Sequence, residues 1–144
     1  MGVVTSACAS TENLEPETGF ADAIIWETLA KLTHFAASGE ASTIDLGGLP
    51  MSNRDRAALD DLLGRGEVSA TLDVIGRSEV WETQFAGVWR VRHHGAEGIA
   101  TDLIEITVCP RILSADRRDA ETAARRLAEA LERKHGIAET AHET

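Results

Sequence analysis

The stretch Gly64–His93, GRGEVSATLDVIGRSEVWETQFAGVWRVRH, decides the fold of this chain because apolar and polar residues alternate along most of it. Alternation with a period of two is typical of half-buried β-strands. Residues 67–75 form one such segment, and Gly76-Arg77 provides a turn after it. Residues 79–93 form a longer β-prone segment whose alternation changes phase around Gly87. We therefore expect two strands, with a bulge or bend at Gly87.

Two further strands are predicted outside this stretch. Residues 102–108 alternate in the same way and are followed by Pro110, which cannot continue a ladder. Residues 43–46 form a short apolar segment closed by Gly47-Gly48. Consecutive strands joined by short turns favour an antiparallel meander. The sequence thus predicts a sheet of about three to four antiparallel strands.

Three segments have apolar residues at helical spacing: 20–37, 52–63 and 114–135. Ser52 and Asp55 form a capping-box pattern at the start of the second, with Gly64 after its end. Asp116 is the candidate N-cap of the third, and Gly136 its expected stop. Together with the meander, these segments predict an α+β fold whose helices pack on one face of the sheet.

The length of 144 residues fits one domain with its own core. Residues 1–18 are small, polar and acidic, so we expect a flexible leader there. We expect a single α+β domain over residues 19–137 and a flexible tail over residues 138–144. Sheet-edge pairing would allow a homodimer.

The formal net charge of −10 disfavours general binding to nucleic acids and to anionic membrane surfaces. No apolar run is long enough to span a bilayer, and residues 1–10 lack a signal-peptide pattern. Cys8 and Cys109 are too few and too far apart for a disulfide framework. We therefore expect a cytoplasmic protein that encounters basic partners.

Candidate chemistry is sparse. Cys109 and His93 or His94 could supply two metal ligands across a hairpin, but adjacent strand residues point to opposite faces. No CxxC, HxH or HExxH spacing is present, so the sequence predicts no dedicated metal site and no cofactor. Glutamates on the predicted strands more often form cross-strand ion pairs than catalytic pairs. The chain therefore does not read as an enzyme.

Trp81, Phe85 and Trp89 fall within nine residues, although aromatic residues make up only 4% of the chain. Aromatic side chains at this density commonly fill a core. The alternative is that one tryptophan is a binding anchor beside Arg90 or Arg92, a composition typical of interface hot spots. The residues alone leave both interpretations open.

Two blocks in this region, LLGRGEVSA at residues 62–70 and WETQFAGVWRVRH at residues 81–93, resemble the hydrogenase expression and formation protein family HupH, also called HyaF or HoxQ. A weaker third element is DLIEI at residues 102–106 followed by Pro110. The resemblance is to the C-terminal region of a family whose members are about twice this length. The chain therefore looks like one C-terminal domain with an added leader.

The resemblance implies a chaperone-like accessory protein for the maturation of nickel–iron uptake hydrogenase. Its expected partner is the immature small subunit or another hydrogenase accessory protein. A metal or iron–sulfur carrier using Cys109 with His93 or His94 is the alternative within the same pathway. No catalytic residues are carried over. Five residues are the candidates for partner binding and three glycines are structural: Glu67, Glu82, Trp89, Arg90 and Arg92, with Gly64, Gly66 and Gly87.

Overall fold

The computed structural model describes residues 18–73 and 75–139, with side chains up to residue 136. The expected leader up to residue 17 and most of the expected tail, and Cys8 with them, lie outside the described residues. The described chain divides into two compact units, one up to Val108 and one from Cys109 onward. Each unit is described by itself below.

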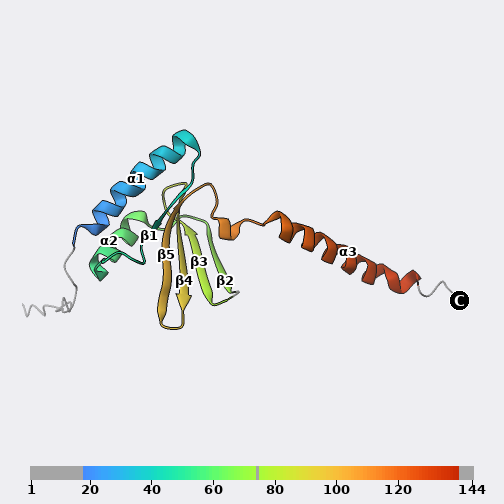
Figure 1. Cartoon of the computed structure of the whole chain (residues 1–144). Helices are drawn as coiled ribbons and strands as arrows, with labels where there is room; N and C mark the ends of the chain where they lie inside the picture. Colours follow the sequence, from blue (N-terminus) through green and yellow to red (C-terminus); the bar gives the residue numbers. More distant parts are fainter. Residues whose placement is uncertain (1–17, 74, 140–144) are drawn as a thin grey trace, which may run out of the picture. The chain divides into compact units, whose positions relative to one another are not determined.

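The first unit is built on a five-stranded antiparallel sheet in the order β1-β5-β4-β3-β2 (Figure 1). The strands β2, β3, β4 and β5 form a meander of consecutive neighbours, and β1 pairs with β5 at the far edge. This confirms the predicted α+β class and the antiparallel meander. The strand bounds are β1 Ser42–Asp45, β2 Ser69–Asp73, β3 Arg77–Glu82, β4 Val88–Gly95 and β5 Gly98–Ile106.

The sheet has five strands where three to four were expected, because residues 79–93 do not form one bent strand. They belong to β3 and β4, which pair with each other and are joined by residues 83–87. The phase change near Gly87 therefore marks a hairpin connection, in which Gly87 has a positive φ of 87°. Likewise β5 begins four residues before Asp102, because Gly95 and Gly98 face each other across a tight turn.

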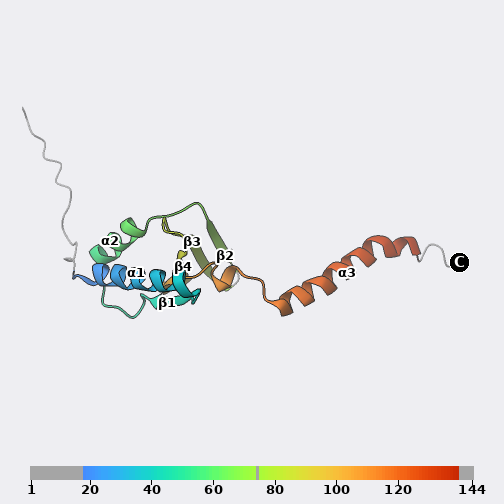
Figure 2. The same cartoon turned by 90° about the horizontal axis from the view of Figure 1, so that it is seen from above.

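Two helices accompany the sheet: α1, Phe20–Ser38, and α2, Asn53–Leu63. α1 ends at Gly39, whose φ of 76° is the left-handed conformation of a C-terminal cap. α2 begins with the predicted capping box, since Ser52 Oγ accepts from Asp55 N and Asp55 Oδ2 accepts from Ser52 N. Both helices lie on the same side of the sheet (Figures 1 and 2).

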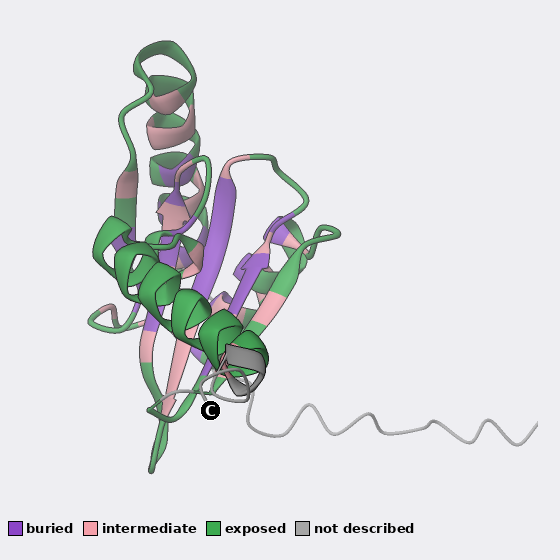
Figure 3. Ribbon diagram, turned by 90° about the vertical axis from the view of Figure 1, so that its right-hand side faces the viewer, coloured by how far each residue is buried: buried purple, intermediate pink, exposed green. Residues whose placement is uncertain are grey.

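The main core lies between these helices and the sheet. Cross-strand neighbours share a face, so the register places Ile44, Ile104 and Arg90 on the helix side. The buried apolar residues gather there, and Figure 3 shows the central strands as the most buried part of the sheet. The buried cluster consists of Ile24, Ile44, Leu46, Leu59, Leu63, Val88, Ile104 and Ile106.

The second unit holds a short 3₁₀ turn, η1, Arg111–Leu113, and the long helix α3, Arg117–Glu139. Asp116 caps α3 as predicted, since its Oδ1 accepts from Arg118 N at 2.8 Å. The helix continues through Gly136, where its end was expected. Among the described residues, no helix is long and apolar enough to cross a membrane.

Candidate functional site

The two sequence blocks quoted above are joined in space by hydrogen bonds. Leu63 O at the end of α2 accepts from Gln84 N at 2.9 Å, and Gln84 Nε2 donates to Leu62 O at 2.5 Å. Gly66 N donates to Glu82 O at 2.7 Å. The end of α2 and the β3–β4 connection therefore form one hydrogen-bonded structure, called the α2–loop junction (residues 62–66 and 82–87) below.

Glycine is required at the centre of this junction by close backbone approach. A Cβ atom at Gly66 would lie 2.7 Å from the carbonyl oxygen of Thr83, closer than carbon and oxygen can pack. Gly64, directly after α2, has a φ of 61°, in the left-handed region. The structural role expected for these glycines thus has a specific cause at each position.

The sheet register separates the residues expected to bind a partner. Arg90 and Arg92 alternate with Trp89 along β4, so the two arginines lie on the helix side and Trp89 lies on the opposite face. Glu82 faces Trp89 across the β3–β4 pair and shares that opposite face. Glu67 is exposed and precedes β2. The structure therefore brings four of the five together as two pairs on opposite faces of the sheet, Arg90 with Arg92 and Glu82 with Trp89.

Arg90 and Arg92 gather with Arg65 around Trp81. Arg65 and Trp81 were not among the five candidates for partner binding. The ring of Trp81 on β3 has three guanidinium groups near it, those of Arg65, Arg92 and Arg90, at 4.2, 5.2 and 5.5 Å from the ring centroid. These distances are in the range of cation–π contacts. We call Arg65, Trp81, Arg90 and Arg92 the arginine–tryptophan cluster.

Acidic side chains hold the inner part of this cluster. Arg90 is 2% exposed and donates to Asp60 Oδ1 at 2.6 Å and to Asp102 Oδ1 at 3.0 Å. Arg92 donates to Asp102 Oδ2 at 3.4 Å, and Arg56 lies 3.7 Å from the same atom. Charged groups buried to this extent need such partners. Arg90 therefore joins α2 to β4 and β5 from inside the unit.

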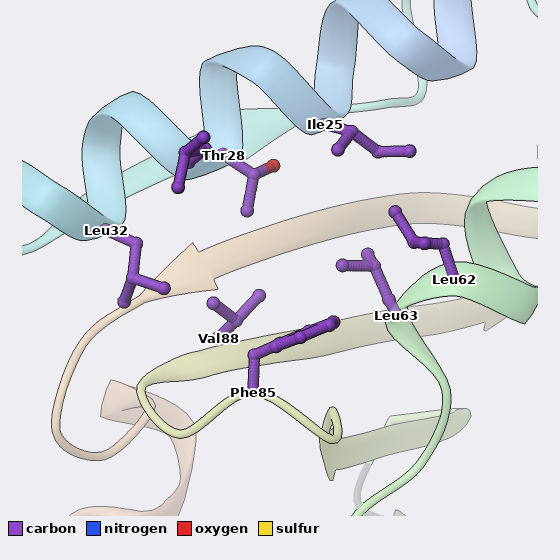
Figure 4. Close-up of a pocket in the computed structure, with 8 residues that line it drawn as sticks. Ile25, Thr28, Leu32, Leu62, Leu63, Phe85 and Val88 are labelled. Carbon is purple, nitrogen blue, oxygen red and sulfur yellow. The ribbon is translucent and has the colours of Figure 1, made fainter.

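An apolar groove lies between α1, the end of α2 and the β3–β4 connection, next to the α2–loop junction. Its volume is about 160 Å³. Figure 4 shows Ile25, Thr28 and Leu32 pointing from α1 toward Leu63, Phe85 and Val88. Several of the residues that line it are also partly exposed at the surface: Leu29 at 51%, Leu62 at 44% and Phe85 at 42%.

The histidines of the metal hypothesis have protein partners. His93 Nδ1 lies 2.5 Å from Ser78 Oγ, and His94 Nε2 lies 3.2 Å from Glu79 Oε2. A register shift between His93 and His94 marks a bulge in β4. Within residues 18–73 and 75–139, no three His, Cys, Asp or Glu side chains gather as a metal site would require.

Three carboxyl groups of the first unit have shifted pKa values. The hydroxyl of Thr18 donates to Asp55 Oδ2 and lowers the pKa of this carboxyl from 3.8 to about 2, against the opposing effect of burial. The hydrogen bond from His94 lowers the pKa of Glu79. Burial raises the pKa of Glu105. Glu79 and Glu105 lie on opposite faces of the sheet, so they do not form an acid–base pair.

Sequence reasoning did not identify Arg65, Asp60 and Asp102 as parts of a site. Arg65 lies within the first sequence block, and an arginine between two glycines close before a strand was the available signal. Asp60 carried no signal, and Asp102 was only the first residue of the weaker third sequence element; they are 30 and 12 positions from Arg90 and meet it only in the fold. The groove side of α1 was visible only as an amphipathic helix.

Comparisons with known proteins agree with this fold. Residues 20–133 match the model of the HupH hydrogenase expression protein, C-terminal conserved region. The structure of the hydrogenase expression protein HupH from Thiobacillus denitrificans is similar with a TM-score of 0.76 and 38% identity, over 81% of this chain and 98% of that one.

Curated relatives are longer than this chain. The hydrogenase expression/formation protein HupH of Rhodobacter capsulatus is 34% identical over 78% of this chain and 41% of its own length. The hydrogenase-1 operon protein HyaF of Escherichia coli is 36% identical over 52% and 26%, respectively. The chain thus spans less than half the length of the curated relatives it matches, and it belongs to the HupH hydrogenase expression protein family through that family's C-terminal conserved region.

Proposed function

We propose that this protein takes part in the maturation of nickel–iron uptake hydrogenase by binding, not by catalysis. Its partner in this proposal is the immature small subunit or another hydrogenase accessory protein. Membership of the HupH family supports a role in hydrogenase expression and maturation. The identity of the partner and the chaperone-like action are the parts that we add.

The observation that carries the proposal is the apolar groove beside the α2–loop junction. A groove lined by Ile25, Leu32 and Phe85 has no charged group to orient a small polar substrate. It suits apolar side chains of a protein segment that is not yet buried in its own fold or assembly. Partly exposed leucines and an aromatic ring around such a groove are typical of protein-binding surfaces.

The arrangement of the carboxylates supports binding over catalysis. Glu82 and Glu105 share one face of the sheet but lie on either side of Trp89, on strands two positions apart. Two strand spacings separate them by about 10 Å at the backbone. Among the described residues, Ser78 Oγ contacts His93 while Glu79 contacts His94, so these hydrogen bonds do not join a serine, a histidine and a carboxylate through one imidazole as a nucleophilic relay requires.

The experiment is capture of a defined partner by the purified chain. The immobilised protein is incubated with extract from cells that express the hydrogenase small-subunit precursor, and the precursor and the known accessory proteins are quantified by immunoblot. Leu29→Gln with Leu62→Gln places two polar amides in the groove. Both positions are about half exposed on helices, so the fold should be preserved. We expect capture to fall about tenfold, as loss of two apolar contacts implies.

The matched control is Trp26→Gln on the same helix α1. Trp26 is 70% exposed and does not line the groove, so this variant should capture the partner as the native chain does. Circular dichroism establishes that each variant is folded. If the native chain retains neither the precursor nor an accessory protein, the proposed function is wrong. If the groove variant and the control behave alike, the groove is not the binding surface.

A further inference from the structure

The arginine–tryptophan cluster has more positive charge than its own carboxylates neutralise. Three guanidinium groups converge on the ring of Trp81 within 5.5 Å of its centroid. Like charges at this separation repel each other, and the effect is strong where water is excluded. Among the described residues, Asp60 and Asp102 are the carboxylates that form ion pairs with Arg90 and Arg92.

A charge count makes the excess explicit. Glu79, the cross-strand neighbour of Arg92, forms ion pairs with Arg77 at 3.0 Å and with His94 at 3.2 Å, so its weaker attraction for Arg65, which also lowers its pKa, is shared with those groups. The remaining set has four guanidinium groups and two carboxylates, a formal excess of two positive charges: Arg56, Arg65, Arg90 and Arg92 against Asp60 and Asp102. This excess lies within a chain whose net charge is −10.

Donor groups in the cluster remain unused. The Nε atoms of Arg90 and Arg92 are buried and have no hydrogen-bond partner within the described chain. Both arginines line a small pocket of about 70 Å³, together with Arg65, Trp81, Asp60 and Gly64. A buried donor without a partner costs free energy, so Asp60 and Asp102 leave the hydrogen-bonding capacity of both guanidinium groups incompletely used. Arg65 is exposed at the mouth, where it can swing onto a bound group.

We propose that this pocket binds a carboxylate group, supplied by an acidic side chain of the protein partner. The inference rests on the proposed function for the source of the carboxylate, and on the geometry for the site. A planar carboxylate matches the planar fork of a guanidinium group and can accept two hydrogen bonds from it. The volume admits a carboxyl group and excludes a nucleotide.

A monoanion is favoured over a phosphate by the neighbours of the pocket. Asp60 lines it, and Asp102 holds two of its arginines from inside. A dianion would meet twice the repulsion from these carboxylates and twice the attraction of the guanidinium groups, but its desolvation in the pocket would cost about four times as much, because that cost grows with the square of the charge.

The test is an NMR titration of the full chain labelled with ¹⁵N. The arginine Nε–Hε signals and the Trp81 indole signal are followed while sodium acetate replaces sodium chloride at constant ionic strength, so that screening is unchanged. We expect saturable shifts of Arg65, Arg92 and Trp81 with acetate. Phosphate at the same concentration and pH 7.5 should bind more weakly.

Arg65→Gln should weaken acetate binding about fivefold, since an exposed ion pair is worth up to about 1 kcal/mol. The matched control is Arg54→Gln on α2, whose arginine is also exposed and lies outside the pocket. It should leave acetate binding unchanged. Acetate shifts no larger than those of chloride overturn the site, as does tighter binding of phosphate or equal loss in both variants.

A second arm identifies the source of the carboxylate. Arg65→Gln and Arg54→Gln are compared in the capture assay described above, and only Arg65→Gln should reduce capture. If acetate binds but both variants capture the partner like the native chain, the site takes a free small carboxylate and its assignment to the partner is overturned. If acetate binds and the native chain captures nothing, the proposed function fails while the carboxylate site stands.

Discussion

Removal of the buried Arg90 guanidinium alone should destabilise the first unit strongly. Replacement of both Arg90 and Asp102 by apolar residues should not. Arg90→Met leaves Asp102, whose side chain is 3% exposed, without its best donor. Asp60 loses the same partner, but its side chain is 46% exposed and can be hydrated. It therefore contributes little to the loss of stability. The perturbation therefore acts mainly through one buried carboxylate.

The size of the expected loss of stability depends on the ion-pair partners that Asp102 keeps. Breaking a buried ion pair from one side costs about 3–5 kcal/mol. Arg92 at 3.4 Å and Arg56 at 3.7 Å still face Asp102, so we expect the lower end, about 3 kcal/mol. For a chain of this size that corresponds to a fall in Tm of roughly 10 °C. In urea the midpoint should fall with an unchanged slope.

The double variant Arg90→Met with Asp102→Leu separates the lost pair from lost packing. With both charges gone, the stability should return to within about 1 kcal/mol of the native chain, since apolar residues of similar volume often replace a buried pair without loss. Arg77→Met, an exposed arginine on β3, should change the free energy of unfolding by no more than about 0.5 kcal/mol. A loss below about 1 kcal/mol in Arg90→Met, or a double variant no better than the single one, would refute the reasoning.

Three further predictions concern the scaffold. Gly66→Ala should cost about 1–3 kcal/mol in a urea titration because its Cβ would meet a backbone carbonyl, while Gly48→Ala, with open space around it, should be nearly neutral. Asp55→Asn should flatten the acid dependence of stability: the native carboxyl, with its pKa lowered to about 2, contributes stability above about pH 3.8 that is lost as the pH falls toward 2. If the thermal melts of Asp55→Asn and the native chain show the same loss between pH 5 and pH 2, this role is wrong. Glu105→Gln should raise Tm at pH 7, since burial raises the pKa of Glu105 and its charged form opposes folding. The gain should shrink as the pH falls below that raised pKa and vanish below the ordinary value of 4.5, and a gain independent of pH would contradict it.

Local patterns in the sequence predicted the elements whose ends are set by local interactions. The capping box of Ser52 and Asp55 fixed the start of α2, and Asp116 fixed the start of α3, because a cap needs only residues within one turn. The alternation of apolar residues likewise identified the central strands and the α+β class. These signals operate over a few residues and need no knowledge of the rest of the fold.

The hairpin between β3 and β4 was missed because its turn is set by a distant segment. Residues 83–87 contain one glycine and no proline, asparagine or aspartate, so a typical turn signal is absent. Gln84 instead bonds to Leu62 and Leu63 at the end of α2. The arginine–tryptophan cluster was missed for the same reason, since Arg65 and Arg90 reach Trp81 only after the sheet and α2 have packed.

The pairing of β1 with β5 sets an order of events for folding. Strands β2 to β5 are neighbours in sequence and close short loops, whereas Ser42 must find Ile106 across more than sixty residues. The entropy cost of closing so long a loop opposes this contact until other tertiary interactions have formed and offset it. We therefore expect the meander to form first and β1 to join last. During synthesis on the ribosome, α1 and β1 would emerge before β5. The groove side of α1 would stay uncovered until β5 has been synthesised.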